Sequence, residues 1–362
     1  MKIVMLGTAL DTKGGISSVV NVYKSNGLFK RWPISYIATH CDGTGLKKIL
    51  VAARGLIFFN LELYRSEVLA VHAHVSSRVS FWRKSVFIAS AFLFRVPVIF
   101  HLHGAEFQVF YKEECSSFRR FLIRSLLNRC YCLIALSPQW QSWLKPLVSR
   151  PAVLSIYNPV QTLNEEVCRE SRKTLLFLGR LGKRKGIYDI IEALVKVKQR
   201  HPDVRLIAAG DGEREEVARY ARLMGVEENI ELPGWIDQKE AVKLRSQSWI
   251  YVMPSYNEGL PMSILEAMSS GLPVISTPVG GIPDAVSDGV EGLLIEPGNV
   301  DQLAESIERL LGDKQLLRQM SLAAEEKVRN TFSSESIVPQ IETIYHEIGR
   351  VRTNALNSTD VV

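Results

Sequence analysis

Two glutamates with seven residues between them mark the stretch of sequence best suited to chemistry. Glu258 and Glu266 lie in NEGLPMSILEAMSSGLPVIST, residues 257–277, on either side of a Gly-Leu-Pro turn. A helix is expected to begin at Pro261, because proline suits the first helical position, and its free amides and macrodipole favour an anion. A carboxylate at Glu266 can accept two hydrogen bonds from a vicinal diol such as a ribose. The layout therefore matches a sugar, a diphosphate and a ribose in sequence along one ligand.

Several other residues suit the same ligand. Arg180 and Lys185 stand five apart in a glycine-containing loop, which could direct two cations at a diphosphate. The glycines Gly14 and Gly15 follow the first apolar run and would let the backbone approach a ligand. His103 lies at the end of the strand pattern IFHLHG, where it could form a hydrogen bond with a hexose hydroxyl.

Each of these residues also has an ordinary structural interpretation. Glu266 could be an acid that the helix dipole favours, and Glu258 a solvated loop acid. Arg180 and Lys185 could belong to an exposed basic loop, and His103 could be structural. His72 and His74 repeat the spacing in VHAHV, and we interpret them as packing residues or residues of an acceptor site.

Short apolar runs alternate with longer helical patterns along the chain, which predicts parallel sheets with crossover helices. The fold predicted is α/β, with two doubly wound, Rossmann-like domains facing a cleft. At 362 residues the chain exceeds a comfortable single core. We predict an N-terminal domain at 1–160, a linker at 161–173, a C-terminal domain at 174–334 and a final helix at 335–350 that packs back on the first domain. The expected strands are 2–8, 34–39, 67–75, 97–104, 130–137, 152–158, 174–180, 204–210, 230–234, 249–255, 272–277 and 291–297.

The motifs in this order resemble those of retaining glycosyltransferases of family 4, which have the GT-B fold. EGLPMSILEAMSSGLPVIST, followed by VGGIPD, resembles the family's Glu-x7-Glu region. FLGRLGKRKGIYDIIEAL, LIAAGDGE, IELPGWI, TKGGISSVV, HLHGAEF and IYNPV are similar to its other landmarks. The resemblance is strong over 174–298 and loose over 1–150. One departure is Pro159, which replaces the glycine usual after the family's asparagine, here Asn158.

The resemblance implies a hexosyltransferase that uses a UDP- or GDP-linked sugar as co-substrate, retains the anomeric configuration and needs no metal or other cofactor. The arginine and lysine would stabilise the departing diphosphate, and Glu258 would hold the donor sugar without acting as a covalent nucleophile. The implied catalytic residues are Glu258, His103, Arg180 and Lys185. The implied donor-binding residues are Gly14, Gly15, Asn158, Gly259, Leu260, Met262 and Glu266.

Charge is distributed unevenly along the chain. Residues 1–160 carry 20 Lys and Arg against 7 Asp and Glu, whereas residues 161–362 carry 24 against 31. Segments 46–65, 78–95 and 118–129 mix these cations with large apolar residues at helical spacing, which suits an anionic membrane surface. We therefore expect a lipid-diphosphate-linked (polyprenyl) sugar acceptor, as used in cell-surface polysaccharide, lipopolysaccharide or O-antigen biosynthesis. The alternative for each segment is a helix packed on the sheet.

Other function classes lack support in the sequence. There is no Walker A motif, no G-x-G-x-x-G, no Asp-x-Asp and no recognisable nucleic-acid-binding module. No apolar run suits a signal peptide or a membrane span, and the five cysteines form no CxxC pair, so we expect a cytoplasmic protein, peripheral on the inner face of the membrane. The alternative functions are a sugar-nucleotide-binding protein without transferase activity and a related GT-B phosphorylase or epimerase.

Overall fold

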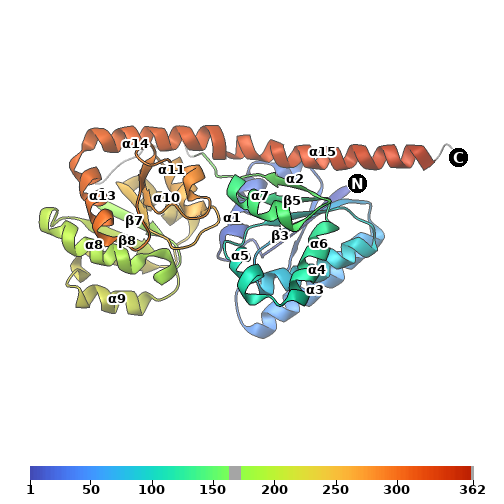
Figure 1. The fold of residues 1–362 in the computed structure, drawn as a ribbon, viewed down its shortest axis with the longest axis horizontal. Helices are drawn as coiled ribbons and strands as arrows, with labels where there is room; N and C mark the ends of the chain where they lie inside the picture. The colour runs from blue at the N-terminus through green and yellow to red at the C-terminus, as the bar shows by residue number, and fades with distance from the viewer. Residues whose placement is uncertain (163–172, 360–362) are drawn as a thin grey trace. The chain divides into compact units, whose positions relative to one another are not determined.

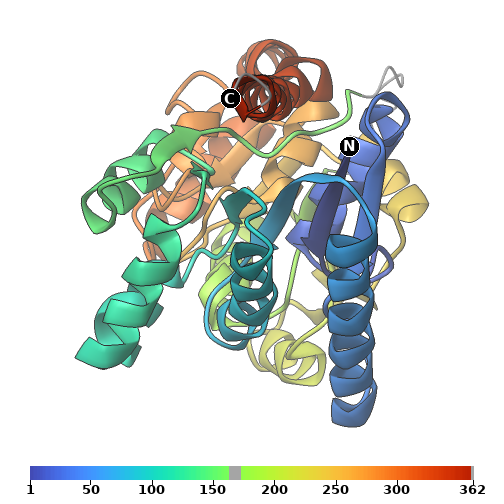
Figure 2. The same cartoon turned by 90° about the vertical axis from the view of Figure 1, so that its right-hand side faces the viewer.

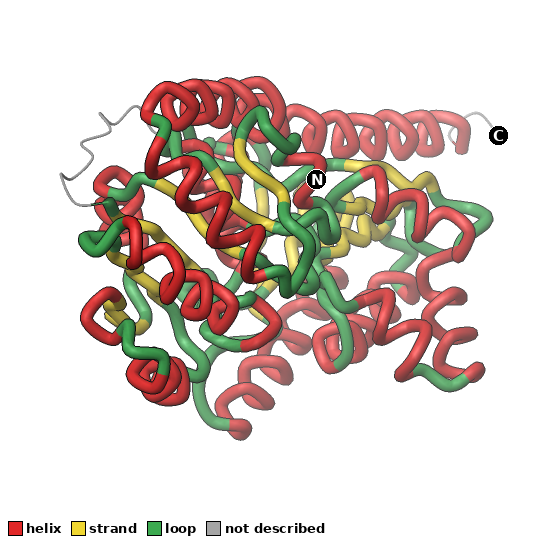
Figure 3. Tube along the Cα trace, turned by 60° about the vertical axis from the view of Figure 1, so that its left-hand side comes forward, coloured by secondary structure: helices red, strands yellow, loops and turns green. Residues whose placement is uncertain are grey.

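The chain divides into two compact units. The computed structural model describes residues 1–162 and 173–359, and within it the first unit comprises Met1–Pro159 and Ser334–Val362, and the second Val160–Ser333. Most of the predicted linker, together with Cys168, lies outside the described residues. In both units the strands lie between helices, as Figures 1 and 3 show.

The first unit is built on a six-stranded parallel sheet in the order β2-β1-β3-β4-β5-β6. Its four inner strands are buried on both faces, as a parallel sheet covered by helices requires, whereas the two edge strands, β2 and β6, are only partly buried. The strands are β1 Lys2–Gly7, β2 Ile34–Ala38, β3 Val68–Val75, β4 Val98–Leu102, β5 Cys132–Ala135 and β6 Ala152–Ser155. The helices are α1 Gly15–Ser25, α2 Leu28–Arg31, α3 Gly45–Arg65, α4 Val79–Leu93, α5 Phe107–Val109, η1 Phe110–Glu114, α6 Ser117–Asn128, α7 Pro138–Leu144, η2 Lys145–Leu147 and α15 Ser334–Thr359.

The C-terminal helix α15 packs on the first unit, where it contacts β3 and α1 (seen nearly end-on in Figure 2). It is longer than the predicted helix at 335–350, because its contacts continue past that range. Tyr345 Oη lies 2.7 Å from His72 Nδ1, and further along the Arg352 guanidinium donates to the backbone oxygens of Val68 and Leu69. A side chain-to-backbone contact of this kind cannot be predicted from the spacing of apolar residues in the sequence.

The second unit contains a second six-stranded parallel sheet, in the order β12-β11-β10-β7-β8-β9. All twelve predicted strands are thus present, and the α/β fold prediction is confirmed. The strands are β7 Thr174–Leu178, β8 Arg205–Ala209, β9 Ile230–Gly234, β10 Ile250–Met253, β11 Val274–Ser276 and β12 Gly292–Leu294. The helices are η3 Lys183–Lys185, α8 Ile187–Arg200, α9 Arg214–Leu223, η4 Glu227–Asn229, α10 Gln238–Gln247, α11 Met262–Ser269, α12 Ile282–Ala285, α13 Val300–Gly312, α14 Lys314–Lys327 and η5 Val328–Phe332.

Candidate active site

Two of the predicted site residues of the second unit follow the strands at which the strand order of its sheet reverses. β7 and β10 are neighbours, but the chain leaves them toward opposite edges, through β8 and β9 on one side and β11 and β12 on the other. Ligands of doubly wound sheets bind beyond the carboxyl ends of the strands at such a reversal. Lys185 follows β7 and Glu258 follows β10, so both are placed at this point.

Glu258 is a buried carboxylate rather than a solvated loop acid, with 6% of the residue exposed. The Lys185 ammonium donates to its Oε1, the Ser255 hydroxyl donates to the same atom at 3.0 Å, and Arg184 Nη1 lies 3.8 Å away. No hydrogen bond from residues 1–162 or 173–359 reaches Oε2, which is therefore able to accept from a sugar hydroxyl. The sequence had assigned Lys185 to the diphosphate and had not identified its contact with Glu258.

Two glycines permit the loops around Glu258 to come this close. Gly186 has φ +74°, and a Cβ there would collide with the carbonyl oxygen of Pro254. Gly280 has φ +59°, and a Cβ there would collide with the carbonyl oxygen of Glu258 itself. Both the left-handed backbone and the close approach require glycine, so the GGIP loop is a support for the acid.

Arg180, the second predicted cation, extends from the loop after β7 toward the loop after β8. A Cβ on Gly212 would lie 3.0 Å from Arg180 Cγ, so the arginine stem passes over that glycine. Arg180 is exposed and makes no ion pair with any residue that the structure describes. One predicted cation is therefore held by the acid, and the other is available to an anionic ligand.

Glu266 lies on α11, about one turn beyond the start of the helix. Its carboxylate Oε2 is 3.4 Å from Nη1 of Arg245, a residue that is 1% exposed and that also donates to Ser270 Oγ at 3.2 Å. Burial raises the pKa of Glu266, and Arg245 partly opposes that rise. Arg245 was missed by the sequence reasoning, since it comes from α10 and meets Glu266 only through packing.

The start of α11 differs slightly from the prediction. Pro261 is the N-cap, with φ −72° and ψ 123°, and Met262 is the first helical residue. Gly259, Leu260 and Met262 are all buried. Gly281 N donates to Gly259 O at 2.5 Å. Gly259 therefore shapes the turn, and the side chains of Leu260 and Met262 belong to the buried core.

The remaining predicted residues belong to the first unit. The backbone at Gly14 and Gly15, which begins α1, has open space around it, since a Cβ at either position would meet nothing within 4 Å. His103 follows β4 and Asn158 follows β6, and a side-chain hydrogen bond with Asn158 acts on the pKa of His103. The structure thus brings His103 and Asn158 together, although they are 55 positions apart in the sequence.

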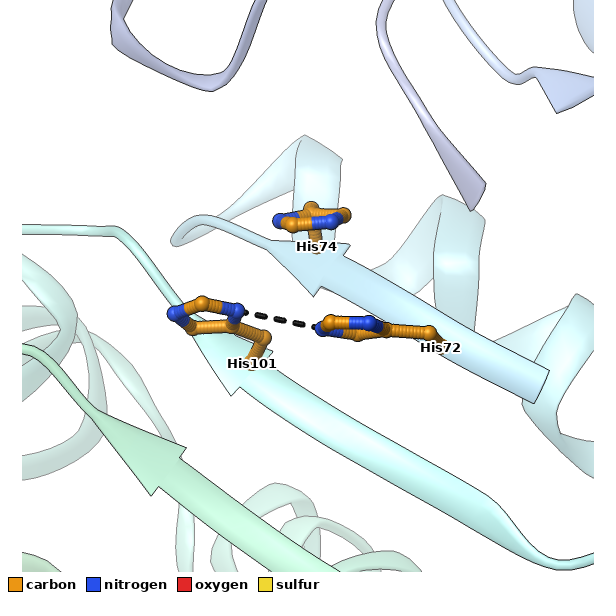
Figure 4. A group of neighbouring side chains, drawn as sticks. All are labelled: His72, His74 and His101. Atoms are coloured by element: carbon orange, nitrogen blue, oxygen red, sulfur yellow. Dashed lines mark hydrogen bonds between the residues drawn. The ribbon is translucent and has the colours of Figure 1, made fainter. Parts of the chain in front are cut away.

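Around His103 lies a group of buried histidines. His72, His74 and His101 are each 0% exposed, and they are the one group in the described residues whose ligand atoms lie close enough together, within 4.8 Å, to suit a metal ion (Figure 4). His72, however, already has both nitrogens engaged, with Tyr345 and with His101. A metal would have to displace one of these hydrogen bonds, so the group fits a metal poorly.

Comparison with known proteins finds glycosyltransferases that are similar to this chain. Residues 162–327 match the family model described as glycosyl transferases group 1. N-acetyl-alpha-D-glucosaminyl L-malate synthase from Bacillus anthracis is 29% identical over 268 residues, which cover 71% of this chain and 69% of that enzyme. The chain spans about half the length of several other curated relatives.

Solved structures match nearly the whole chain. Sucrose-phosphate synthase from Thermosynechococcus elongatus has a TM-score of 0.78 at 19% identity, covering 97% of this chain and all of that one. HepE from Anabaena, solved with UDP and glucose, has a TM-score of 0.73 at 20% identity, covering 95% and 99%. At these identities the likeness concerns the fold, and it confirms the GT-B prediction.

Proposed function

We propose that the chain transfers a hexose from a nucleotide-sugar to a sugar acceptor, with retention of the anomeric configuration and without a metal. The observation that carries the proposal is the buried Glu258 with Lys185 at the strand-order reversal of a unit that matches the group 1 glycosyltransferase model. Arg180 and the α11 start supply further positive potential for a diphosphate. HepE binds UDP and UDP-glucose, which supports a UDP-linked donor for this chain.

In the proposed reaction the bond between the anomeric carbon and the diphosphate oxygen breaks, and its electron pair leaves with the nucleotide. The acceptor hydroxyl oxygen forms the new bond on the same face of the sugar, and its proton passes to the departing phosphate oxygen. Lys185 and Arg180 stabilise the negative charge that develops on the diphosphate. Glu258 orients the donor sugar through Oε2, and its charge favours positive character at the ring.

The proposal is tested by donor binding followed by product detection. Thermal shift against UDP-, GDP- and ADP-sugars identifies the donor, and mass spectrometry with a polyprenyl-diphosphate-linked sugar detects transfer. We expect turnover to be unchanged by EDTA. Binding without turnover on any acceptor sugar would favour the alternative, a sugar-nucleotide-binding protein. Phosphate-dependent cleavage of the product, or epimerised nucleotide-sugar, would favour a related phosphorylase or epimerase.

On acidification, donor binding is expected to weaken at a higher pH than it would if the carboxyl group had an ordinary pKa. Burial raises the pKa of Glu266, so on acidification this group loses its charge, and with it an acceptor for the ribose diol, at a higher pH than a solvated glutamate. Glu266→Gln is expected to weaken nucleoside diphosphate binding about 10-fold, which is about 1.4 kcal/mol, and to remove the pH dependence. Calorimetric titration from pH 7.5 to 5 measures both, and an unchanged pH dependence in the variant contradicts the assignment.

We further propose that the acceptor is lipid-linked and that the first unit binds the inner face of the cytoplasmic membrane. Helices α3, α4 and α6 expose an unusual number of large apolar side chains: Leu46, Ile49, Leu50, Ile57, Phe58, Leu61, Tyr64, Val79, Val86, Leu93, Phe118, Phe121 and Leu122. On α3 most follow a spacing of three, four or seven, so they share one face, and Lys47, Lys48 and Arg54 lie among them. Such a face suits anionic headgroups with apolar residues inserted beneath them.

None of the helices in the described ranges is both long and apolar enough to cross a membrane. The membrane proposal is therefore tested by vesicle flotation. We expect the protein to float with phosphatidylglycerol vesicles and less with phosphatidylcholine vesicles, and to be released by salt. Ile57→Glu with Phe58→Glu should lower binding at least about 10-fold, since each inserted charge costs several times the thermal energy. Leu223→Glu, at a still more exposed apolar residue on α9, should have no effect, and equal losses in both variants would contradict the proposal.

A further inference from the structure

Four histidines on neighbouring strands form two separate hydrogen-bonded pairs in the first unit. His72 and His74 are on β3, His101 is on β4, and His103 directly follows it. His74 Nδ1 lies 2.8 Å from His103 Nε2, and His72 Nε2 lies 3.1 Å from His101 Nδ1. Figure 4 shows the His72 and His101 rings joined edge to edge by a hydrogen bond, with His74 beside them. Each contact requires one nitrogen with a proton and one without.

All four imidazoles are neutral at physiological pH. Burial lowers the pKa of His72 and of His103 to about 3, and it lowers the pKa of His74 and His101 well below the usual value. The fully buried Lys84 adds repulsion against protons on His74 and His103. A neutral ring has a single N–H, so the direction of the His74–His103 hydrogen bond determines where the proton of His103 resides.

One observation decides that direction. His74 Nε2 is buried and makes no hydrogen bond with any described residue. If His74 accepted at Nδ1, its proton would sit on this isolated Nε2, and a buried N–H without a partner is costly. If His74 donates at Nδ1, only a lone pair is isolated. His103 Nε2 is then the acceptor, and the single proton of the neutral His103 ring resides on Nδ1.

We propose that His74 is a positioning residue, which donates its Nδ1–H to His103 Nε2 and thereby fixes His103 as the neutral tautomer with its proton on Nδ1. His103 then presents a hydrogen-bond donor beside Asn158, where a sugar hydroxyl oxygen can accept. The tautomer follows from the geometry alone, whereas its use in sugar transfer rests on the proposed function. His72, which faces Tyr345 and His101, has no part in this assignment.

Nitrogen-15 NMR of the histidine-labelled full chain tests the tautomer without any activity measurement. We expect His103, assigned by its loss in His103→Gln, to show a protonated Nδ1 and a bare Nε2 at pH 7. His74→Leu should turn His103 into a mixture of tautomers, whereas His74→Gln, whose amide can still donate, should preserve the native one. His72→Gln is the matched control on the same strand and should leave His103 unchanged. A protonated Nε2 in the native chain, or an unaltered His103 in folded His74→Leu, would overturn the proposal.

The role of His74 in sugar transfer is tested separately, by steady-state kinetics. We expect kcat to fall about 10-fold in His74→Leu and to recover to within about 3-fold in His74→Gln, as for loss of one oriented polar group, while the donor KM stays unchanged. A shifted tautomer with native kcat would overturn the role in transfer. If the native chain transfers no sugar, the proposed function fails, and the NMR result still decides the tautomer.

Discussion

Replacing Lys185 with methionine is expected to lower kcat for sugar transfer about 100- to 1,000-fold. Lys185 follows β7 at the strand-order reversal, and its ammonium carries the positive charge nearest to Glu258. The loss is of the size seen when one preorganised group that stabilises developing charge is removed. Initial rates at saturating donor measure it. Lys183→Met, an exposed lysine in the same loop, is the matched control and should retain native kcat.

Lys185→Met is also expected to lower the free energy of unfolding, because Glu258 would be left buried without its cation. Removing one partner of a buried ion pair costs about 3 kcal/mol, whereas removing both charges costs much less. The double variant Lys185→Met with Glu258→Gln should therefore unfold in urea closer to the native chain than either single variant, yet remain inactive. Recovery of activity along with stability would show that Lys185 matters only as a counterion. Equal stability of all four proteins would show that the pair is not coupled.

Much of the fold could be predicted because its signals are local. Each strand is a short apolar run bounded by glycine, proline or polar residues, and buried parallel strands require such runs. The reversal of strand order, which places Lys185 and Glu258 side by side, could be expected only through the family resemblance. The length of α15 could not be predicted, since its last part is held by the Arg352 contact with the backbone of β3.

The sequence proposed residue types for the candidate site, but it could not predict the contacts between them. Periodicity places His74 on a known face of β3 and His103 just after β4, but the meeting of their ring nitrogens depends on strand register and side-chain rotamers. The contact between Arg245 and Glu266 could not be predicted from the sequence either. Arg245 ends a polar helix in the sequence, and only the packing of α10 against α11 brings it to Glu266. The sequence predicted Lys185 as a diphosphate-binding residue, and its contact with Glu258 became visible only in the three-dimensional structure.

Replacing Glu258 with glutamine is expected to reduce kcat at least about 100-fold and to leave donor affinity within about 3-fold of native. Glutamine keeps the shape of the side chain and an oxygen that can accept from the sugar. It removes the negative charge that favours positive character at the anomeric carbon, and a charge that acts mainly in the transition state affects kcat more than binding. Rapid-quench kinetics and calorimetric binding of the nucleotide-sugar separate the two quantities. Glu266→Gln provides the contrast, with weaker donor binding and a smaller loss of kcat.

The anomer of the product and the presence or absence of a sugar on Glu258 distinguish a residue that orients the donor from a covalent nucleophile. If Glu258 only orients the donor sugar and stabilises its positive charge, no peptide containing Glu258 gains the mass of a sugar in the native enzyme. This holds even with a donor chosen so that release of a covalent glycosyl-enzyme would be slow. The residual product of Glu258→Gln then keeps the retained anomer. A glycosylated Glu258 peptide would instead assign it as a nucleophile, and the proton transfer to the departing phosphate would need revision. Geometry favours the first result, because Lys185 and Ser255 both donate to Oε1, and a carboxylate stabilised by two donors is a weak nucleophile.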